Sequence, residues 1–459
     1  MAIGKIFSTL GSSQSLVPLA IKDCANGLGA TAGSAVTSKE EAKDRFIDEF
    51  GTAAIWLGGI PFFKYLTDKT LFKATKYDPK YDVRNLQSNE IYKKTLEYAP
   101  TEKIKQGIKK IGENQKTFKN LNVGKFVAST VLALGAYNVL TEAKQKYTEK
   151  KIRTRLIKQL ELESKVKMNL QNNQNELKDK NFDSMATFRS NSTVENKGDK
   201  PSFKGLQSFM LDPVKNMMIL DGGITTQRLA NSRSPQEFIG YTIKEAGFLY
   251  FMYVLGEKVQ NHFEKVADKK HNKSIALDAR VIENNEFKES FRNGSVLKDL
   301  EAFKQADKGD GALYDFIKAE TDKGITKQAK NTVIDVATQS DLIQTYKKPK
   351  KWYQIFKKAE DTQLLDTRKY IDLKKVRETH ANVGKLYSQF EKSGQTVDEF
   401  FNGVRKLKRA SIMKNMASTI LALGVVLPAV MLADRLLRDG NKEFAVEKRI
   451  KEELEAKKA

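Results

Sequence analysis

The feature that most constrains this chain of 459 residues is a repeat within it. Residues 82–91 (DVRNLQSNEI) match residues 278–287 (DARVIENNEF), with Asp, Arg, Asn and Glu identical at the same spacing. Later in each half, residues 128–135 (ASTVLALG) match residues 417–424 (ASTILALG). Apolar helices of similar composition resemble one another, which accounts for the second match but not for the first. We therefore predict a tandem duplication of one unit.

Shorter matches lie in the same order along the chain. Residues 47–51 (IDEFG) align with residues 243–247 (IKEAG), and residues 16–18 (LVP) align with residues 211–213 (LDP). Gly51 and Gly247 each open an apolar stretch, and we expect close approach of two helices there rather than a ligand. Ordered matches over this length indicate that the repeated unit is most of each half.

The fold class predicted from the residue pattern is mainly α, because alternating runs of β-branched and aromatic residues hardly occur. The first helical unit covers residues 1–171, a polar linker covers 172–203, and the second unit covers 204–459. The second unit carries an insertion at about 293–380. Apolar residues recur at helical spacing within the insertion over residues 297–306, 313–319 and 333–346. We expect short apolar helices or hairpins in both units and a small helical subdomain in the insertion.

A long charged helix is predicted at the end of the first unit. After Gly135 no glycine or proline occurs until Gly198, and apolar residues recur loosely at helical spacing from Ile152 to Leu177. From about residue 172 the composition turns to Asn, Lys, Asp, Ser and Gly, which is typical of a linker.

Four apolar stretches are long enough to contact a bilayer. They cover residues 51–63, 126–140, 246–256 and 415–433. A spanning helix needs about 20 apolar residues, so only the last stretch approaches that length, and Pro428 lies inside it. Shorter stretches are typical of core helices, interfacial helices or re-entrant hairpins.

The charges beside these stretches are basic on every side. The chain has a formal net charge of +23, and the connections after the first and second stretches and the C-terminal tail are all rich in lysine. Because loops on opposite sides of a membrane differ in their content of lysine and arginine, uniform flanks favour hairpins that enter from one side, or no membrane at all. An anionic membrane lipid is the partner that this balance favours, with a protein partner as an alternative and nucleic acid as a weaker one.

We select two sets of residues for the membrane contact. The membrane-inserting set is apolar and comes from the two matched blocks: Ala417, Ile420, Leu421, Leu423, Val426, Leu427, Phe126, Val131, Leu132 and Leu134. The set expected to bind an anionic surface is basic, with one aromatic residue: Arg405, Lys406, Lys408, Arg409, Lys350, Lys351 and Trp352. Two other interpretations of residues 347–358 stay open: a solvated helix with one aromatic face on the core, and a nucleic-acid site in which bases stack on the aromatic rings.

The motifs of common enzymes are missing from the sequence. The three histidines, His262, His271 and His380, lack the spacing of a helical metal site, and Cys24 is the single cysteine. Gly124-Lys125 is followed by Phe126, which cannot supply the hydroxyl of a phosphate loop. We expect no enzyme activity, no cofactor, no metal and no small-molecule substrate.

The repeated Asp82-x-Arg84 and Asp278-x-Arg280 are the charged pairs kept in both halves. They fit a helix cap with a surface ion pair better than two related binding sites. Our first hypothesis for the whole chain is a non-enzymatic, membrane-associated helical scaffold with most of its mass on the cytoplasmic side. The alternatives are a soluble cytoplasmic protein- or nucleic-acid-binding factor whose apolar stretches form its core, and a small membrane transport unit.

Overall fold

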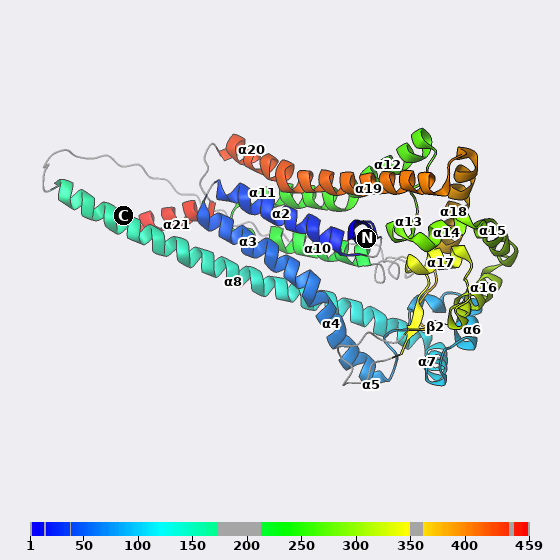
Figure 1. The fold of residues 1–459 in the computed structure, drawn as a ribbon. Helices are drawn as coiled ribbons and strands as arrows, with labels where there is room; N and C mark the ends of the chain where they lie inside the picture. Colours follow the sequence, from blue (N-terminus) through cyan, green and yellow to red (C-terminus); the bar gives the residue numbers. More distant parts are fainter. Residues whose placement is uncertain are drawn as a thin grey trace.

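The computed structural model describes residues 2–12, 15–36, 38–171, 213–348, 361–439 and 445–457. The described residues are mostly helical, which confirms the predicted class (Figure 1). They form three regions along one axis: a helical bundle in the middle, a head of short helices at one end, and a narrow tail at the other. The predicted linker, residues 172–203, lies outside the described residues.

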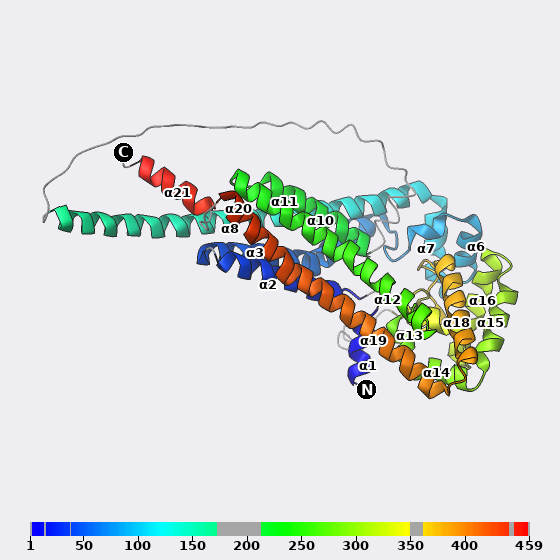
Figure 2. The same cartoon turned by 90° about the horizontal axis from the view of Figure 1, so that it is seen from above.

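The bundle contains six helical runs that lie side by side. They are α2 (Val17–Ala35), α3 (Lys39–Ala54), the first part of α8 (Gln115–Gln171), α10 (Pro213–Ala230), α11 (Pro235–Leu249), and a rod made by α19 (Val397–Leu421) and α20 (Leu427–Asp439). Seen from above, the rod runs from the head to the far end of the bundle (Figure 2). Ser38 and Ser234 begin α3 and α11, each accepting a hydrogen bond from the backbone of a glutamate three residues later.

Three of these runs contain a wider, π-helical turn inside the bundle. The turns are η1 (Ile55–Gly59) between α3 and α4 (Ile60–Thr67), η4 (Tyr250–Leu255) between α11 and α12 (Gly256–His271), and η7 (Ala422–Val426) in the rod. Such turns are rare and are often found at functional sites. A fourth π-helical turn, η2 (Asp68–Phe72), leads through α5 (Lys73–Thr75) into the head.

Glycines set how closely the bundle helices approach. A Cβ atom on Gly29 of α2 would lie 2.5 Å from the carbonyl oxygen of Gly424, so the two backbones touch there. A Cβ atom on Gly51 would lie 2.5 Å from Leu140, and one on Gly247 would lie 2.5 Å from Leu427. The predicted close approach at Gly51 and Gly247 is therefore confirmed, and in both cases a leucine occupies the space.

The head combines segments from both predicted units. Its elements are η3 (Val83–Leu86), α6 (Asn89–Glu97), α7 (Glu102–Glu113), α13 (Ala279–Glu283), α14 (Asn285–Arg292), α15 (Ser295–Ala306), α16 (Asp310–Lys323), η5 (Gly324–Thr326), α17 (Thr332–Gln339), β1 (Thr345–Lys347), β2 (Asp361–Leu365) and α18 (Leu373–Ser393). The two strands pair antiparallel, with Thr345 opposite Leu365. Ile91 of α6 packs in the same cluster as Leu313 and Ile317 of α16, so the insertion rests on the first unit.

One part of the predicted insertion is wrong. The sequence predicted helical spacing over residues 333–346, but α17 ends at Gln339 and β1 begins at Thr345. Asp341 has a backbone φ of 58°, in the left-handed region that a helix cannot continue through. Buried Ile343 and Tyr346 are three residues apart, a spacing that predicts a helix, although Tyr346 lies in β1.

The tail confirms the predicted long helix. Helix α8 continues to Gln171, and α21 (Ala445–Ala456) packs on it through Ile152, Leu156, Val446 and Ile450. At the other end of the chain, α1 (Ala2–Leu10) packs beside α13 and α19.

Helices α8 and α10 run in the same direction along the bundle axis. In α8 and α10, Leu134 lies near Gly223 and Gln145 bonds to the carbonyl of Asn231, so the two helices are parallel. Both start at the head and end at the tail side (Figure 1). The end of α8 and the start of α10 therefore lie at opposite ends of the bundle.

The matched sequence blocks adopt the same local structure. Asp82 accepts a hydrogen bond from the backbone N–H of Arg84 at 2.9 Å, and Asp278 does the same with Arg280 at 2.9 Å. Each pair also forms an ion pair between its side chains, which confirms the predicted caps. The duplication itself stays a prediction.

Candidate functional site

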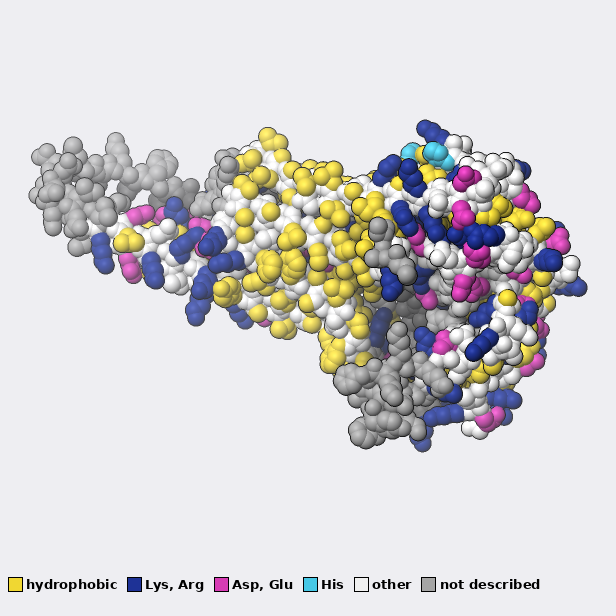
Figure 3. Space-filling view, viewed as in Figure 1, with side chains coloured by type: hydrophobic (Ala, Val, Ile, Leu, Met, Phe, Trp, Pro, Cys, Tyr) yellow, Lys and Arg dark blue, Asp and Glu magenta, His cyan; other side chains and the backbone are white. Residues whose placement is uncertain are grey.

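The outer surface of the bundle is apolar on each of its helical runs. Leu28 of α2 is 58% exposed, Val131 of α8 is 60% exposed and Val425 of η7 is 58% exposed. Other large apolar side chains that stand exposed on the bundle are Phe46, Leu57, Val139, Met218, Phe238, Ile239, Tyr250, Leu421 and Val430. On the face that Figure 3 shows, hydrophobic side chains gather over the bundle, while charged side chains gather on the head and on the tail. We call this surface the girdle.

A girdle of this kind is unusual for a protein that faces water. Exposed apolar patches on soluble monomers are small and are normally confined to one face. Two helical runs, Gln115–Lys165 and Val397–Leu437, are long and apolar enough to cross a membrane, a test that core helices of soluble proteins also pass. Only 17% and 28% of their most apolar windows are buried, however, so these two helices are not core helices.

The interior of the bundle is charged. Arg228 of α10 lies at its centre with a side chain that is 5% exposed. Its guanidinium forms ion pairs with Asp48 at 3.1 Å, with Glu245 at 2.5 Å and with Glu49 at 3.7 Å. Lys244, which is 1% exposed, pairs with Glu49 at 2.5 Å and with Glu245 at 2.8 Å. Four helices, α3, α8, α10 and α11, thus meet around buried charges.

The same network extends toward the tail end of the bundle. Lys144 of α8 lies 3.3 Å from Asp48 and 3.4 Å from Asp44. Arg233, in the turn after α10, pairs with Asp44 at 3.2 Å and with Glu237 at 2.7 Å. We call these residues, together with Arg45, the ionic core: Asp44, Arg45, Asp48, Glu49, Lys144, Arg228, Arg233, Glu237, Lys244 and Glu245. Its carboxylates and its cations are equal in number.

Two tyrosines complete the ionic core. Tyr137 donates to Asp48 at 3.1 Å and accepts from Arg228 at 3.0 Å. The Arg45 guanidinium lies over the ring of Tyr241, 4.3 Å from the ring centre. Charges inside an apolar medium are stable only when each is paired and hydrogen-bonded, and this arrangement meets that condition for most of them.

A second polar group lies beside the π-helical turns. Trp56 of η1 donates its indole N–H to Asp23 of α2 at 2.9 Å. Tyr253 of η4 donates its hydroxyl to Asp221 of α10. Each half of the bundle therefore has an aromatic donor on a π-helical turn that donates to an aspartate, on α2 in the first half and on α10 in the second. Asn26 links Asp23's helix to the ionic core by donating to Glu49 at 3.2 Å.

The predicted membrane-inserting residues all lie in the bundle, and some face outward. Leu421, Val426, Val131 and Leu132 are exposed on the girdle, and Ile420 is 36% exposed. Ala417 is also exposed, and Phe126 and Leu134 are half-buried. Leu423 and Leu427 are buried against Phe248 and Met252 of the neighbouring run. The exposed members are the ones available for contact with lipid.

The predicted anionic-surface residues do not form one free basic surface. Arg405 donates to the carbonyl of Ile282 at 2.9 Å, and Lys408 donates to the carbonyl of Ile275 at 2.7 Å. Arg409 pairs with Glu283 at 2.6 Å. These three side chains join α19 to the head, which leaves Lys406 exposed. The remaining members, Lys350, Lys351 and Trp352, lie outside the described residues.

The ionic core was not predicted from the sequence. Its signal was present in the matched blocks IDEFG and IKEAG, where Glu49 and Glu245 occupy the same position just before an apolar stretch.

The second missed feature is a third Asp-x-Arg pair, in which Asp366 accepts hydrogen bonds from the backbone and side chain of Arg368. This pair packs against the first one, because Asp82 donates its backbone N–H to the carbonyl of Arg368 at 2.8 Å.

These features define a mainly α protein with a paired ionic interior inside an apolar girdle. Comparison with models of known protein families, with curated proteins and with solved structures finds no match. Among the described residues, no group of three or more His, Cys, Asp or Glu side chains is arranged to hold a metal ion. Cys24 is exposed on α2.

Proposed function

We propose that this protein is a non-enzymatic helical scaffold that is embedded in a membrane through its girdle. The observation that carries the proposal is that apolar side chains stand exposed on each helical run of the bundle while charges are buried inside it. Hydrocarbon favours this distribution and water opposes it. Helix α2 has 19 residues, or about 28 Å, which is close to the hydrocarbon thickness of about 30 Å.

The experiment that tests the proposal is fractionation of cells that express the full chain. Membranes are washed with high salt and then with alkaline carbonate, and the chain is followed by immunoblot. We expect the chain to stay in the membrane pellet through both washes, because the girdle holds it by apolar contact. Release by salt would contradict the proposal, and so would recovery in the untreated supernatant.

A matched pair of variants makes this test specific. Val425→Glu places a carboxylate on the girdle, where a charge at membrane depth costs about 2.5–3.5 kcal/mol. Ile325→Glu changes a side chain that is 52% exposed on the head. We expect the first variant to reduce the carbonate-resistant fraction and the second to leave it unchanged. Equal behaviour of the two variants would mean that the girdle does not contact lipid.

A small transport unit is the second candidate, and the ionic core favours it. Transport pathways commonly carry charged groups at membrane depth, beside interrupted helices. The stretch 415–433 contains no charged residue, but α3, α10 and α11 supply buried charges inside the bundle. Reconstituted proteoliposomes loaded with a pH-sensitive dye would separate the two candidates. If the protein is a scaffold, the proteoliposomes should leak protons at the same rate as empty vesicles. If it is a transport unit, they should leak faster, and Lys244→Met should change that rate.

A further inference from the structure

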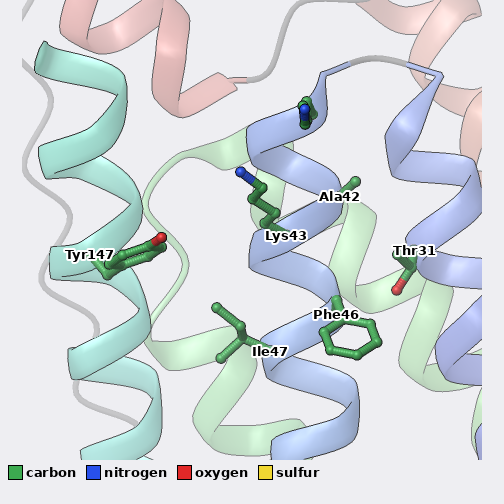
Figure 4. Close-up of a pocket in the computed structure, with 7 residues that line it drawn as sticks. Thr31, Ala42, Lys43, Phe46, Ile47 and Tyr147 are labelled. Atoms are coloured by element: carbon green, nitrogen blue, oxygen red, sulfur yellow. The ribbon is translucent and has the colours of Figure 1, made fainter. Parts of the chain in front are cut away.

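A groove with a volume of about 460 Å³ crosses the girdle near the tail end of the bundle. It lies over the outer face of α3, between α2 and α8. Its lining is formed by Thr31, Lys39, Ala42, Lys43, Phe46, Ile47 and Tyr147. In Figure 4, Tyr147 points from α8 toward α3, where Lys43 lies nearer the start of the helix and Phe46 and Ile47 lie further along it. The groove is therefore apolar inside, with lysines at one end.

The lysines at this end are not neutralised by the chain. Lys39 and Lys43 are exposed and form no ion pair with another described residue. The nearby acids are already occupied, because Glu40 pairs with Arg155 at 2.6 Å and Glu41 pairs with Arg435 at 2.8 Å. Lys151, one turn beyond the groove on α8, adds a third cation above the ring of Tyr147. An uncompensated positive charge thus stands at the mouth.

We propose that this groove binds one anionic glycerophospholipid, with its phosphate at Lys39 and Lys43 and an acyl chain along Phe46 and Ile47. The inference rests on the proposed membrane embedding and adds a specific ligand to it. Basic pockets between helices at the membrane boundary are sites of this kind. The groove has cations at the end of α3 and apolar side chains toward the middle of the bundle. A phospholipid has its charged headgroup and its acyl chain in the same order.

The geometry favours a lipid over a peptide or a soluble anion. An apolar peptide would leave the two lysines without a partner, and a soluble phosphate would leave the floor of Phe46 and Ile47 uncovered. A phospholipid satisfies both, because one molecule carries a charged phosphate and hydrocarbon chains. Phe46, at 48% exposed, and Tyr147, at 48% exposed, also open the groove sideways onto the girdle, where the proposed embedding places lipid.

The test is native mass spectrometry of the full chain in detergent, with phosphatidylglycerol or phosphatidylcholine added at equal concentration. We expect one phosphatidylglycerol to be retained in preference to phosphatidylcholine. The double variant Lys39→Gln with Lys43→Gln should lower that retention about 30-fold, as two lysines beside a phosphate predict. Lys103→Gln with Lys105→Gln, two exposed lysines of α7, is the matched control and should retain lipid as the parent chain does.

A second variant separates the acyl site from the charge. Ala42→Phe fills the groove and leaves both lysines in place, so it should lower retention of phosphatidylglycerol without changing the charge of the chain. Equal retention of the two lipids by the parent chain would overturn the inference, as would unchanged retention by both groove variants. The carbonate wash distinguishes this outcome from failure of the membrane proposal, because a chain that resists carbonate but shows no lipid preference loses the site and keeps the embedding.

Discussion

The head and the bundle are built with opposite arrangements of the same side chains. In the head, Phe287, Phe291 and Phe401 form a buried aromatic cluster, and ion pairs such as Arg292 with Asp398 lie on the outside. In the bundle, Arg228 and Glu245 are buried and Leu28 and Val131 are exposed. The head therefore buries apolar side chains and exposes charged ones, as proteins in water do. The bundle exposes apolar side chains and buries charged ones, as proteins in an apolar medium do. One continuous chain contains both arrangements, and α19 passes from the first to the second, because Phe401 near its start is buried and Leu421 at its end is exposed.

The largest expected effect comes from breaking the ionic core. Arg228→Met leaves Asp48 and Glu245 buried without their main partner, so we expect the free energy of unfolding to fall by about 3–5 kcal/mol. The measurement is a denaturant titration of the chain in detergent. Arg153→Met removes the exposed pair with Glu453 and should change the same quantity by no more than about 1 kcal/mol. Equal losses would mean that buried and exposed pairs stabilise this chain alike.

A pair of phenylalanines compares the two regions directly. Phe291→Ala removes a side chain that is 3% exposed in the head and should lower the free energy of unfolding by about 3–5 kcal/mol. Phe62→Ala, at a side chain 57% exposed on α4, should change it by about 0.5 kcal/mol or less in detergent. The same titration measures both. A large loss from Phe62→Ala would show that this ring packs on protein and not on its surroundings.

Substituting alanine for either of two glycines in the bundle should change the free energy of unfolding in opposite directions. Gly29→Ala places a Cβ against the backbone of Gly424 and should lower the free energy of unfolding by about 1–3 kcal/mol. Gly135→Ala meets open space on α8 and should raise it by about 0.5–1 kcal/mol, because alanine favours the helix. Detergent titration of the two single variants checks this. A gain from Gly29→Ala would contradict the close contact between α2 and η7.

The smallest expected effect concerns a hydrogen bond between a tyrosine and a carboxylate in the head. Tyr98 donates its hydroxyl to Asp315 at 2.6 Å, and this hydrogen bond raises the pKa of Tyr98 to about 12. The stabilisation is therefore present below pH 10, the ordinary pKa, and is lost as the pH rises through 12. The difference in tyrosinate absorbance between the parent chain and Tyr98→Phe measures this titration. Asp315→Asn should return the midpoint toward 10, and an unchanged midpoint would contradict the assignment.

The sequence predicted features that depend on neighbouring residues. It predicted the helical class, the long helix α8, the caps at Asp82 and Asp278, and the close helix approach at Gly51 and Gly247. Each of these depends on residue types that are close together in the sequence, and the caps and the two glycines were visible in the repeat. The end of α17 was missed because buried Ile343 and Tyr346 are three residues apart, a spacing that predicts a helix, although Tyr346 lies in a strand.

The candidate site could be predicted only in part. The apolar stretches that form the girdle were found, since a run of apolar residues is visible in one segment. The ionic core was not, because Asp48, Arg228 and Glu245 become neighbours only when α3, α10 and α11 assemble. The prediction ended each apolar stretch at the nearest charge, so the charges beside Gly51 and Gly247 were assigned to the flanks. Their positions on the inner side of each helix were the missing information.

The parallel direction of α8 and α10 has a consequence for biosynthesis. Each half of the chain makes three passes along the bundle axis, so the first half ends on the side opposite to its start. The second half starts again at the head side, where α10 begins, and the sequence between the two halves contains Lys178, Asp179 and Lys180, which hydrocarbon does not accept. A translocon that releases helices one after another would leave the second half inverted. Six full passes therefore require a protein-lined route for this segment during assembly, whereas a bundle that enters lipid without crossing it can be made after release from the ribosome.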